Sequence, residues 1–156
     1  MGRNCSTIAA ETYILKSPHK IMECIFCKIS NGDIPTQIIT ESPHSIAFLD
    51  AFPLTKGHTL VIPKNHHEKI QHLSAEENSD LFSTVHKIIS KVDTLTGATL
   101  VAVHNGKEAG QEIPHVHIHL VPRSSNDSGG PIHCLFDSTL NVSDSETNEI
   151  FEKLRD

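Results

Sequence analysis

The sequence predicts an α+β domain with an antiparallel five-stranded sheet, one long helix and one short helix. Two observations support this fold class. Short apolar and β-branched runs are bounded by glycine and proline, whereas one long segment has helical periodicity. Because the order strand, strand, helix, strand, strand shows no regular alternation of strands and helices, we expect an antiparallel sheet.

The first half of the chain provides the short helix and three strands. The segment 25–29 has helical spacing and is ended by Gly32, which is a typical helix stop. A turn rich in proline, lysine and glycine separates the second strand from the third and favours antiparallel pairing. The three strands are expected at 37–41, 45–50 and 58–62.

The second half begins with the long helix, expected from Ala75 to Leu95. Ser74 and Glu77 have capping-box spacing at its start, and apolar residues then recur at helical intervals. Two more strands are expected at 99–103 and 115–121, and a weak amphipathic helix from Ser143.

The chain divides into a central domain and two terminal segments. We expect a disordered tail or a mis-assigned start over 1–21, with Met22 as the true start. The domain is expected over 22–123, followed by a linker and weak helix over 124–156. An alternative reading of the first residues is membrane anchoring, because they match the N-myristoylation pattern at Gly2, with Cys5 as a second acylation site.

Composition argues against two classes of function. The net charge of −6 over 156 residues, without a basic patch, argues against nucleic-acid binding. No apolar run approaches the roughly 20 residues of a membrane span. We therefore expect a cytoplasmic protein whose four cysteines are not disulfide-bonded. The anomaly is the presence of twelve histidines.

Three of these histidines, His115, His117 and His119, alternate with apolar residues in one expected strand. Successive side chains of a strand point to opposite faces, so the imidazoles share one face and Val116 and Ile118 the other. Such a face suits a zinc site, a proton relay, or attack on phosphorus by one histidine while its neighbours hold the phosphoryl group. The spacing alone leaves these alternatives open.

The residues before this strand favour phosphoryl transfer. Gly106 and Gly110 allow backbone N–H groups to approach an anion closely. Asn105 and Gln111 add neutral amide donors beside the strand.

A C-x-x-C pair offers a separate place for a metal. Cys24 and Cys27 have the spacing of half a zinc site, and His66 is a candidate third ligand with His67 as its competitor. A redox role would need a thioredoxin-like βαβ context, which the pattern lacks. The remaining alternative is that both cysteines are simply small buried hydrophobic residues.

Several motifs together resemble the histidine triad (HIT) superfamily. The segment His-Val-His-Ile-His-Leu-Val-Pro-Arg at 115–123 looks like its signature, and 105–112 is similar to its substrate loop. Collinear matches from Cys24 onward are Cys-Ile-Phe-Cys-Lys-Ile, Gly-Asp-Ile-Pro, Ala-Phe-Leu-Asp and Lys-Gly-His-Thr-Leu-Val-Ile-Pro-Lys. The resemblance, to the Hint-like or prokaryotic-type zinc-containing members, implies the HIT-like fold with its sheet extended across a homodimer.

The resemblance implies a nucleotide hydrolase acting on nucleoside phosphoramidates or adenylylated conjugates. His117 would attack the α-phosphorus, and water would then release the monophosphate from a nucleotidyl-histidine intermediate. His119 would hydrogen-bond the phosphoryl oxygens, and His58 would support a triad ring. A Fhit-like hydrolase of dinucleoside polyphosphates is the alternative. The alternative of another class is a non-catalytic signalling or scaffold dimer that binds a purine nucleotide.

The resemblance also implies substrate contacts and a metal site. Gln111 would help hold the α-phosphate, and Asp50 would bind the ribose. Glu112 stands where some members carry a serine, so the acid that protonates the leaving group is unassigned. The expected substrate set is Ile25, Phe26, Ile29, Phe48, Asp50, Asn105, Gly110, Gln111 and Glu112. One structural zinc per chain, without an organic cofactor, would be bound by Cys24, Cys27, His66 and His115.

The homodimer also has support from the residues themselves. The run 99–103 is apolar and uncharged, and an unpaired strand edge needs a cover, which a second copy related by a two-fold axis supplies. We expect Leu81, Val85 and Ile88 of the long helix to form a second apolar surface. Residues 131–156 are expected to pack near the partner's site.

Overall fold

The computed structural model describes residues 24–136 and 140–155. It falls into two compact units, one that runs to Ser128 and another that begins at Gly129. The expected tail over 1–21, together with Met22, lies outside the described residues. The same is true of the acylation sites at Gly2 and Cys5.

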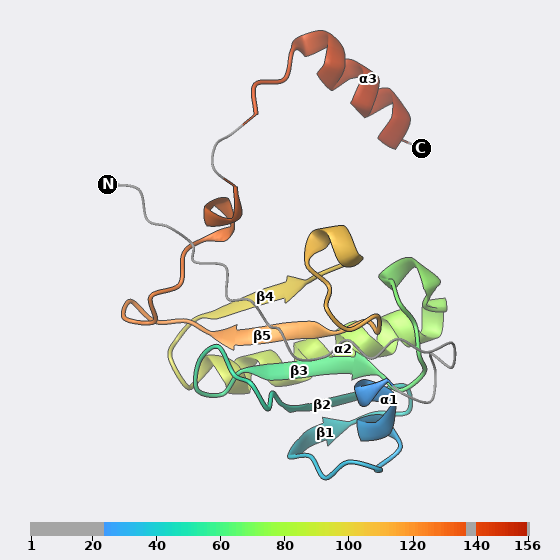
Figure 1. Ribbon diagram of the computed structural model, residues 1–156, viewed down its shortest axis with the longest axis vertical. Coiled ribbons are helices and arrows are strands. Elements are labelled where there is room, and N and C mark those ends of the chain that lie inside the picture. Colours follow the sequence, from blue (N-terminus) through green and yellow to red (C-terminus); the bar gives the residue numbers. More distant parts are fainter. Residues whose placement is uncertain (1–23, 137–139, 156) are drawn as a thin grey trace. The chain divides into compact units, whose positions relative to one another are not determined.

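The first unit is built on one antiparallel sheet of five strands in the order β1-β2-β3-β5-β4 (Figure 1). The strands are β1 (Ile38–Glu41), β2 (Ser45–Leu49), β3 (Thr59–Pro63), β4 (Thr99–Val103) and β5 (Ile118–Pro122). The short helix α1 (Ile25–Ser30) and the long helix α2 (Ala75–Asp93) complete it. The predicted α+β class, with five strands and two helices of unequal length, is confirmed.

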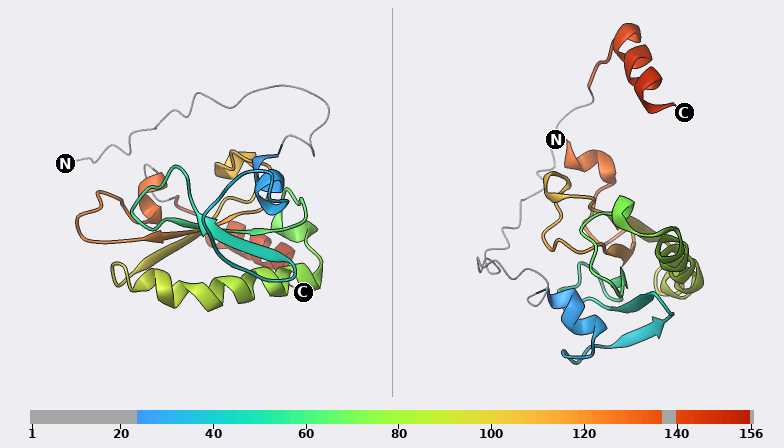
Figure 2. Two further views of the ribbon diagram at one scale, coloured as in Figure 1. Left: turned by 90° about the horizontal axis from the view of Figure 1, so that it is seen from below. Right: turned by 90° about the vertical axis from the view of Figure 1, so that its right-hand side faces the viewer.

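The two helices cover opposite faces of the sheet (Figure 2). On the α2 side, Leu81, Val85 and Ile88 are buried with residues of the central strands. The expectation that these three residues form a dimer surface is wrong, because the sheet of the same chain covers them. On the α1 side, Phe26 and Ile29 pack with residues of β2 and β3.

The histidine-rich segment has the predicted alternation. Val116, Ile118 and Leu120 lie in the core on the α2 side, so the three histidines point to the other face. The strand begins at Ile118, three residues later than expected. The reason is that Val116 donates its N–H to the carbonyl of His67, at 2.7 Å, instead of to a neighbouring strand.

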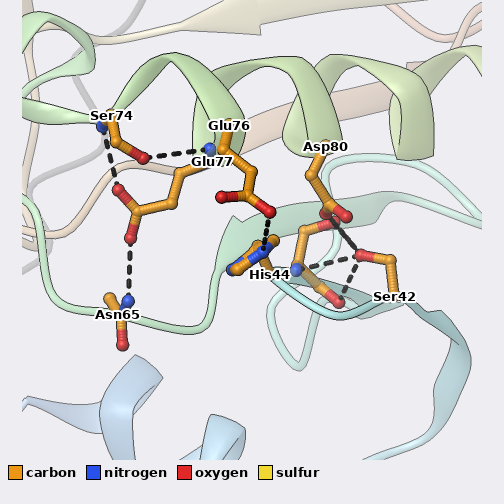
Figure 3. A network of polar contacts seen from close by, with 8 residues as sticks. Ser42, His44, Asn65, Ser74, Glu76, Glu77 and Asp80 are labelled. Atoms are coloured by element: carbon orange, nitrogen blue, oxygen red, sulfur yellow. Dashed lines mark hydrogen bonds and ion pairs between the residues drawn. The ribbon is translucent and has the colours of Figure 1, made fainter.

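The start of α2 is tied to the loop that follows β3 (Figure 3). The predicted capping box is present, because Ser74 Oγ accepts the Glu77 N–H at 3.2 Å and Glu77 Oε2 accepts the Ser74 N–H at 2.9 Å. Glu77 Oε1 also accepts hydrogen bonds from Asn65 Nδ2 at 2.8 Å and His67 Nε2 at 3.0 Å. Hydrogen bonds from Asn65, Ser74 and His67 lower the pKa of Glu77 to about 2. These contacts hold both neighbours of His66 in place.

The second unit contains helix α3 (Asp144–Leu154). Ser143 and Glu146 form a capping box at its start, which confirms the helix expected there. Its apolar residues Ile150, Phe151 and Leu154 are exposed. Among the helices of residues 24–136 and 140–155, none combines the length and the apolar character needed to cross a membrane.

Candidate active site and metal centre

His117 is held as a neutral imidazole with a defined tautomer. Its Nδ1 lies 2.7 Å from the backbone carbonyl of His115, and since a carbonyl only accepts, Nδ1 must donate. The lone pair is therefore on Nε2. Burial lowers the pKa of His117, so the ring is uncharged at neutral pH. A neutral imidazole with an available Nε2 lone pair can act as a nucleophile.

His119 and His58 form a hydrogen-bonded pair beside it. The N–H of Leu54 donates to His58 Nδ1 at 3.2 Å, which places the proton of His58 on Nε2. That nitrogen lies 3.0 Å from His119 Nδ1, so His119 carries its own proton on Nε2. In the described part of the chain, His119 Nε2 is a buried nitrogen without a hydrogen-bond partner. It is therefore a donor available to a phosphoryl oxygen.

Burial keeps this pair uncharged as well. Desolvation, followed by the neighbouring His117, His58 and His104, lowers the pKa of His119 to about 3. Desolvation also lowers the pKa of His58, against the opposing effect of Asp50, whose Oδ2 is 3.4 Å from His58 Nδ1. The predicted support of a triad ring by His58 is thus a direct contact with His119 in the structure.

The expected nucleoside side lies between α1 and β2. The Phe26 ring is 5.1 Å from the His117 ring and 6.1 Å from the Phe48 ring, measured between centroids. Phe26, Ile29 and Phe48 are buried in the core on this face, whereas Ile25 is 37% exposed. Their contact with a base stays a prediction, and so does that of Asp50 with a ribose. Asp50 follows β2, and its Oδ1 accepts the Phe52 N–H at 2.9 Å.

The side-chain amides of the expected substrate loop form hydrogen bonds within the protein. Asn105 Oδ1 accepts the Ile70 N–H at 2.9 Å, and its Nδ2 donates to Gln71 at 3.0 Å. Gln111 Oε1 accepts the Gly106 N–H at 2.7 Å, and its Nε2 donates to the carbonyl of Glu68 at 2.8 Å. Both side chains therefore hold the loop in place, and their contact with a phosphate stays a prediction.

Backbone donors of this loop are engaged too. The N–H groups of Ala109, Gly110 and Gln111 donate to carbonyls of Gly106 and Lys107 at 2.9–3.2 Å. Gly110 has a φ of 91°, which favours glycine there. The glycines therefore lie in a compact turn, and the anion cradle expected from them stays a prediction. Glu112, which follows this loop, is exposed.

His104, which directly follows β4, is a site residue that was not expected from the sequence. Ala102 pairs with His119 across the sheet, and side chains two residues apart share a face, so His104 lies on the face of the triad. Its ring centroid is 5.6 Å from that of His119. Only the register between β4 and β5 reveals this position, and no local motif marks it.

The candidate metal centre lies on the same side of the sheet. His115 Nε2 donates to the carbonyl of Pro63 at 2.9 Å, so the lone pair of Nδ1 faces the thiols. Nδ1 is 3.4 Å from Cys24 Sγ and 3.6 Å from Cys27 Sγ, and His66 Nδ1 is 3.3 Å from Cys27 Sγ. Tetrahedral bonds of about 2.3 Å to sulfur and 2.0 Å to nitrogen would separate a sulfur from a nitrogen ligand by roughly 3.5 Å. The four residues therefore fit a zinc ion.

The competing ligand, His67, has another partner. Its Nε2 bonds to Glu77, whereas His66 joins the cluster whose four ligand atoms lie within 4.8 Å of one another. Burial, followed by the neighbouring His66, His117 and His67, lowers the pKa of His115 to about 4, although its bond to Pro63 opposes this. Burial and the Cys24 thiol raise the pKa of Cys27 to about 11. A bound cation would stabilise the thiolate that burial disfavours.

Comparison with known proteins places the chain in a family. The model of the HIT domain matches residues 31–126. The chain belongs to the HIT family. An adenosine 5'-monophosphoramidase of Schizosaccharomyces pombe is 42% identical to it over 108 residues, which are 69% of this chain and 80% of that protein.

Two solved HIT-family structures agree with the fold. The structure of a family member from Bacillus subtilis has a TM-score of 0.72 and 33% identity, and the match covers 85% of this chain and 94% of that one. A zinc-bound family protein from Mycobacterium smegmatis has a TM-score of 0.60 and 35% identity, with 69% and 79% covered. The predicted family and the HIT-like fold of the chain are thereby confirmed.

The triad of this HIT protein is divided between two sites. His115 faces the cysteines, whereas His117 and His119, whose ring centroids are 4.9 Å apart, face the candidate active site. The Phe26 ring contacts both His115 and His117, at centroid distances of 5.8 and 5.1 Å. The Phe26 side chain therefore packs against both the candidate metal centre and the candidate active site.

Proposed function

We propose that this HIT protein is a hydrolase that attacks the α-phosphorus of nucleoside phosphoramidates or adenylylated conjugates and releases the nucleoside monophosphate. The observation that supports it most directly is the Nε2 lone pair of His117, which the carbonyl of His115 fixes beside the donor Nε2–H of His119. The monophosphoramidase name of the S. pombe relative supports the P–N bond as the target.

The reaction has two displacements. In the first, the Nε2 lone pair of His117 forms a bond to phosphorus while the bond to the leaving group breaks, giving a nucleotidyl-histidine. The Nδ1–H of His117 stays on the His115 carbonyl and shares the positive charge that the ring acquires. Water then displaces the ring. Throughout, His119 Nε2–H donates to a phosphoryl oxygen, and His58 fixes its orientation.

The remaining site residues position a purine nucleotide in this proposal. The carboxylate of Asp50 lies beside His58 at the end of β2 and binds the ribose hydroxyls in this proposal. Phe26 and its neighbours of the α1-side core form the apolar wall that a base needs. Gln111 and Gly110 shape the loop that closes the phosphate side.

One zinc per chain is proposed for the Cys24, Cys27, His66 and His115 site, with a structural role. All four residues supply ligand atoms, which would leave no position on a tetrahedral ion for substrate or water. When bound, the ion would link α1, the loop after β3 and the segment before β5. The zinc-bound M. smegmatis relative supports this choice of metal.

We also propose a homodimer whose sheets join along β4, and a cytoplasmic location. β4 lies at one edge of the sheet, and Leu100 and Val101 on it are 40% and 43% exposed. Apolar side chains at an exposed sheet edge favour pairing with a second copy. The catalytic domain is proposed over 22–123, with 131–156 near the partner's site. A reducing compartment would keep the zinc-binding thiols available.

The decisive experiment measures turnover of an adenosine 5'-phosphoramidate beside diadenosine polyphosphates. Faster turnover of the phosphoramidate supports the proposal. Preference for the polyphosphates would assign the protein to the alternative reaction. Binding of adenosine monophosphate without turnover of either substrate would make it a nucleotide-binding dimer or monomer.

A further inference from the structure

We propose that His104 is a catalytic residue of this site and gives the proton that the leaving group needs when its bond to phosphorus breaks. The inference rests on the proposed function, since it requires a nucleotidyl transfer to His117. It supplies a role that the sequence left unassigned.

The strand order places His104 on the leaving-group side. Across the sheet the order β2, β3, β5, β4 puts Asp50 after β2, His58 before β3, the triad at β5 and His104 after β4. A nucleoside that occupies the Asp50 side, with its α-phosphate at the triad, directs its leaving group toward β4. His104 is the imidazole that the structure places there.

The position of the His104 ring supports contact with substrate. The ring centroid lies 5.6 Å from that of His119, whose Nε2–H is available to the phosphoryl oxygen. The ring also lies near Gly110, where a Cβ would be 3.7 Å from His104 Cδ2 and 3.8 Å from Nε2. In the register of β4 with β5, Val103 pairs with Ile118, so the next residue, His104, also lies beside the position of His117.

Other groups of the candidate active site are less suited to this task. The amides of Asn105 and Gln111 do not release a proton, and both hold the loop. His119 Nε2–H is required for the phosphoryl oxygen, and the His58 proton holds His119. An imidazole takes up and releases a proton near neutral pH, which is the property that a general acid needs.

The proton balance closes over the two displacements. In the first, the P–N bond breaks, its electron pair goes to the amine nitrogen, and protonated His104 transfers its proton there, so that a neutral amine departs. In the second, water bonds to phosphorus and gives a proton to His104, and the electron pair of the P–N bond returns to His117 Nε2. His104 is then protonated again.

The test compares two substrates that differ in their need for a proton. An alkylamine phosphoramidate of adenosine needs an acid at its leaving nitrogen, whereas the p-nitrophenyl ester of adenosine monophosphate releases a stable anion. For His104→Gln we expect a loss of about 100-fold in kcat/KM with the alkylamine and less than about 3-fold with the ester. A partly misfolded variant would lose both activities equally, so the ratio of the two losses is the readout.

Two further variants sharpen the comparison. His86→Gln, at an exposed position of α2, is the matched control and should leave both rates unchanged. Glu112→Gln tests the competing acid. Equal losses on both substrates for His104→Gln, no loss on either, or a selective loss in Glu112→Gln instead would overturn the proposal. If the wild type turned over neither substrate, the proposed function itself would fail.

Discussion

The carboxylate of Glu77 should contribute substantially to folding stability. Its pKa is lowered from 4.5 to about 2 in the folded protein, and one pKa unit corresponds to about 1.4 kcal/mol, which gives roughly 3 kcal/mol. In the wild type, both carboxylate oxygens of Glu77 accept hydrogen bonds, from Asn65, His67 and Ser74. Glu77→Gln keeps the size of the side chain but replaces one of these oxygens with an NH₂ group, which cannot accept from the donors that face it. We expect the variant to lose about 2–3 kcal/mol at pH 7.

Urea unfolding of wild type and variant, followed by circular dichroism, measures this loss. The folded pKa lies below the unfolded one, so the stabilisation is present above about pH 4.5 and is lost as the pH falls toward 2. The difference between the two proteins should therefore be constant from pH 7 to about 5 and shrink below that. Glu76→Gln is the control, because that side chain is 79% exposed, and it should change stability by less than about 0.5 kcal/mol. A Glu77→Gln loss below about 0.5 kcal/mol at pH 7 would refute the reasoning.

The other predictions concern catalysis, metal binding, assembly and the C-terminal segment. His117→Ala should lower kcat by at least about 1000-fold in a phosphoramidate assay while adenosine monophosphate still binds, and retention of a few per cent of turnover would contradict the nucleophile assignment. Elemental analysis should find one zinc per chain, and a chelator or Cys27→Ser should lower the melting temperature, whereas metal-free purified protein would exclude the site. Light scattering at tens of micromolar should give twice the chain mass, and truncation after Arg123 should alter substrate preference or dimerisation. A monomer, or a truncated protein unchanged in both respects, would count against these last two expectations.

The features that sequence determined by itself are local ones. The alternation of histidines with apolar residues gave the correct face for each side chain, because strand side chains alternate whatever their neighbours are. Both capping boxes follow from residues three positions apart, so Ser74 with Glu77 and Ser143 with Glu146 could be recognised directly. The C-x-x-C pair can likewise be recognised directly, because its two cysteines are only three positions apart.

The tertiary structure decided what depends on long-range contacts. His66 rather than His67 lies beside the cysteines. The reason is that the ring of His67 is hydrogen-bonded to Glu77, ten residues further along the chain. The side-chain amides of Asn105 and Gln111 form hydrogen bonds with the segment 68–71, more than thirty residues away in the sequence. A local sequence pattern does not reveal such contacts.

The position of His104 shows the same division between local and long-range information. Its place opposite the triad follows from the pairing of β4 with β5, and the register of two strands is set by packing of their side chains against the rest of the fold. The sequence by itself therefore determined which residue types can do chemistry and on which face each strand presents them. The tertiary structure decided which of them meet, since contacts between distant segments depend on register and loop conformation that no short motif specifies.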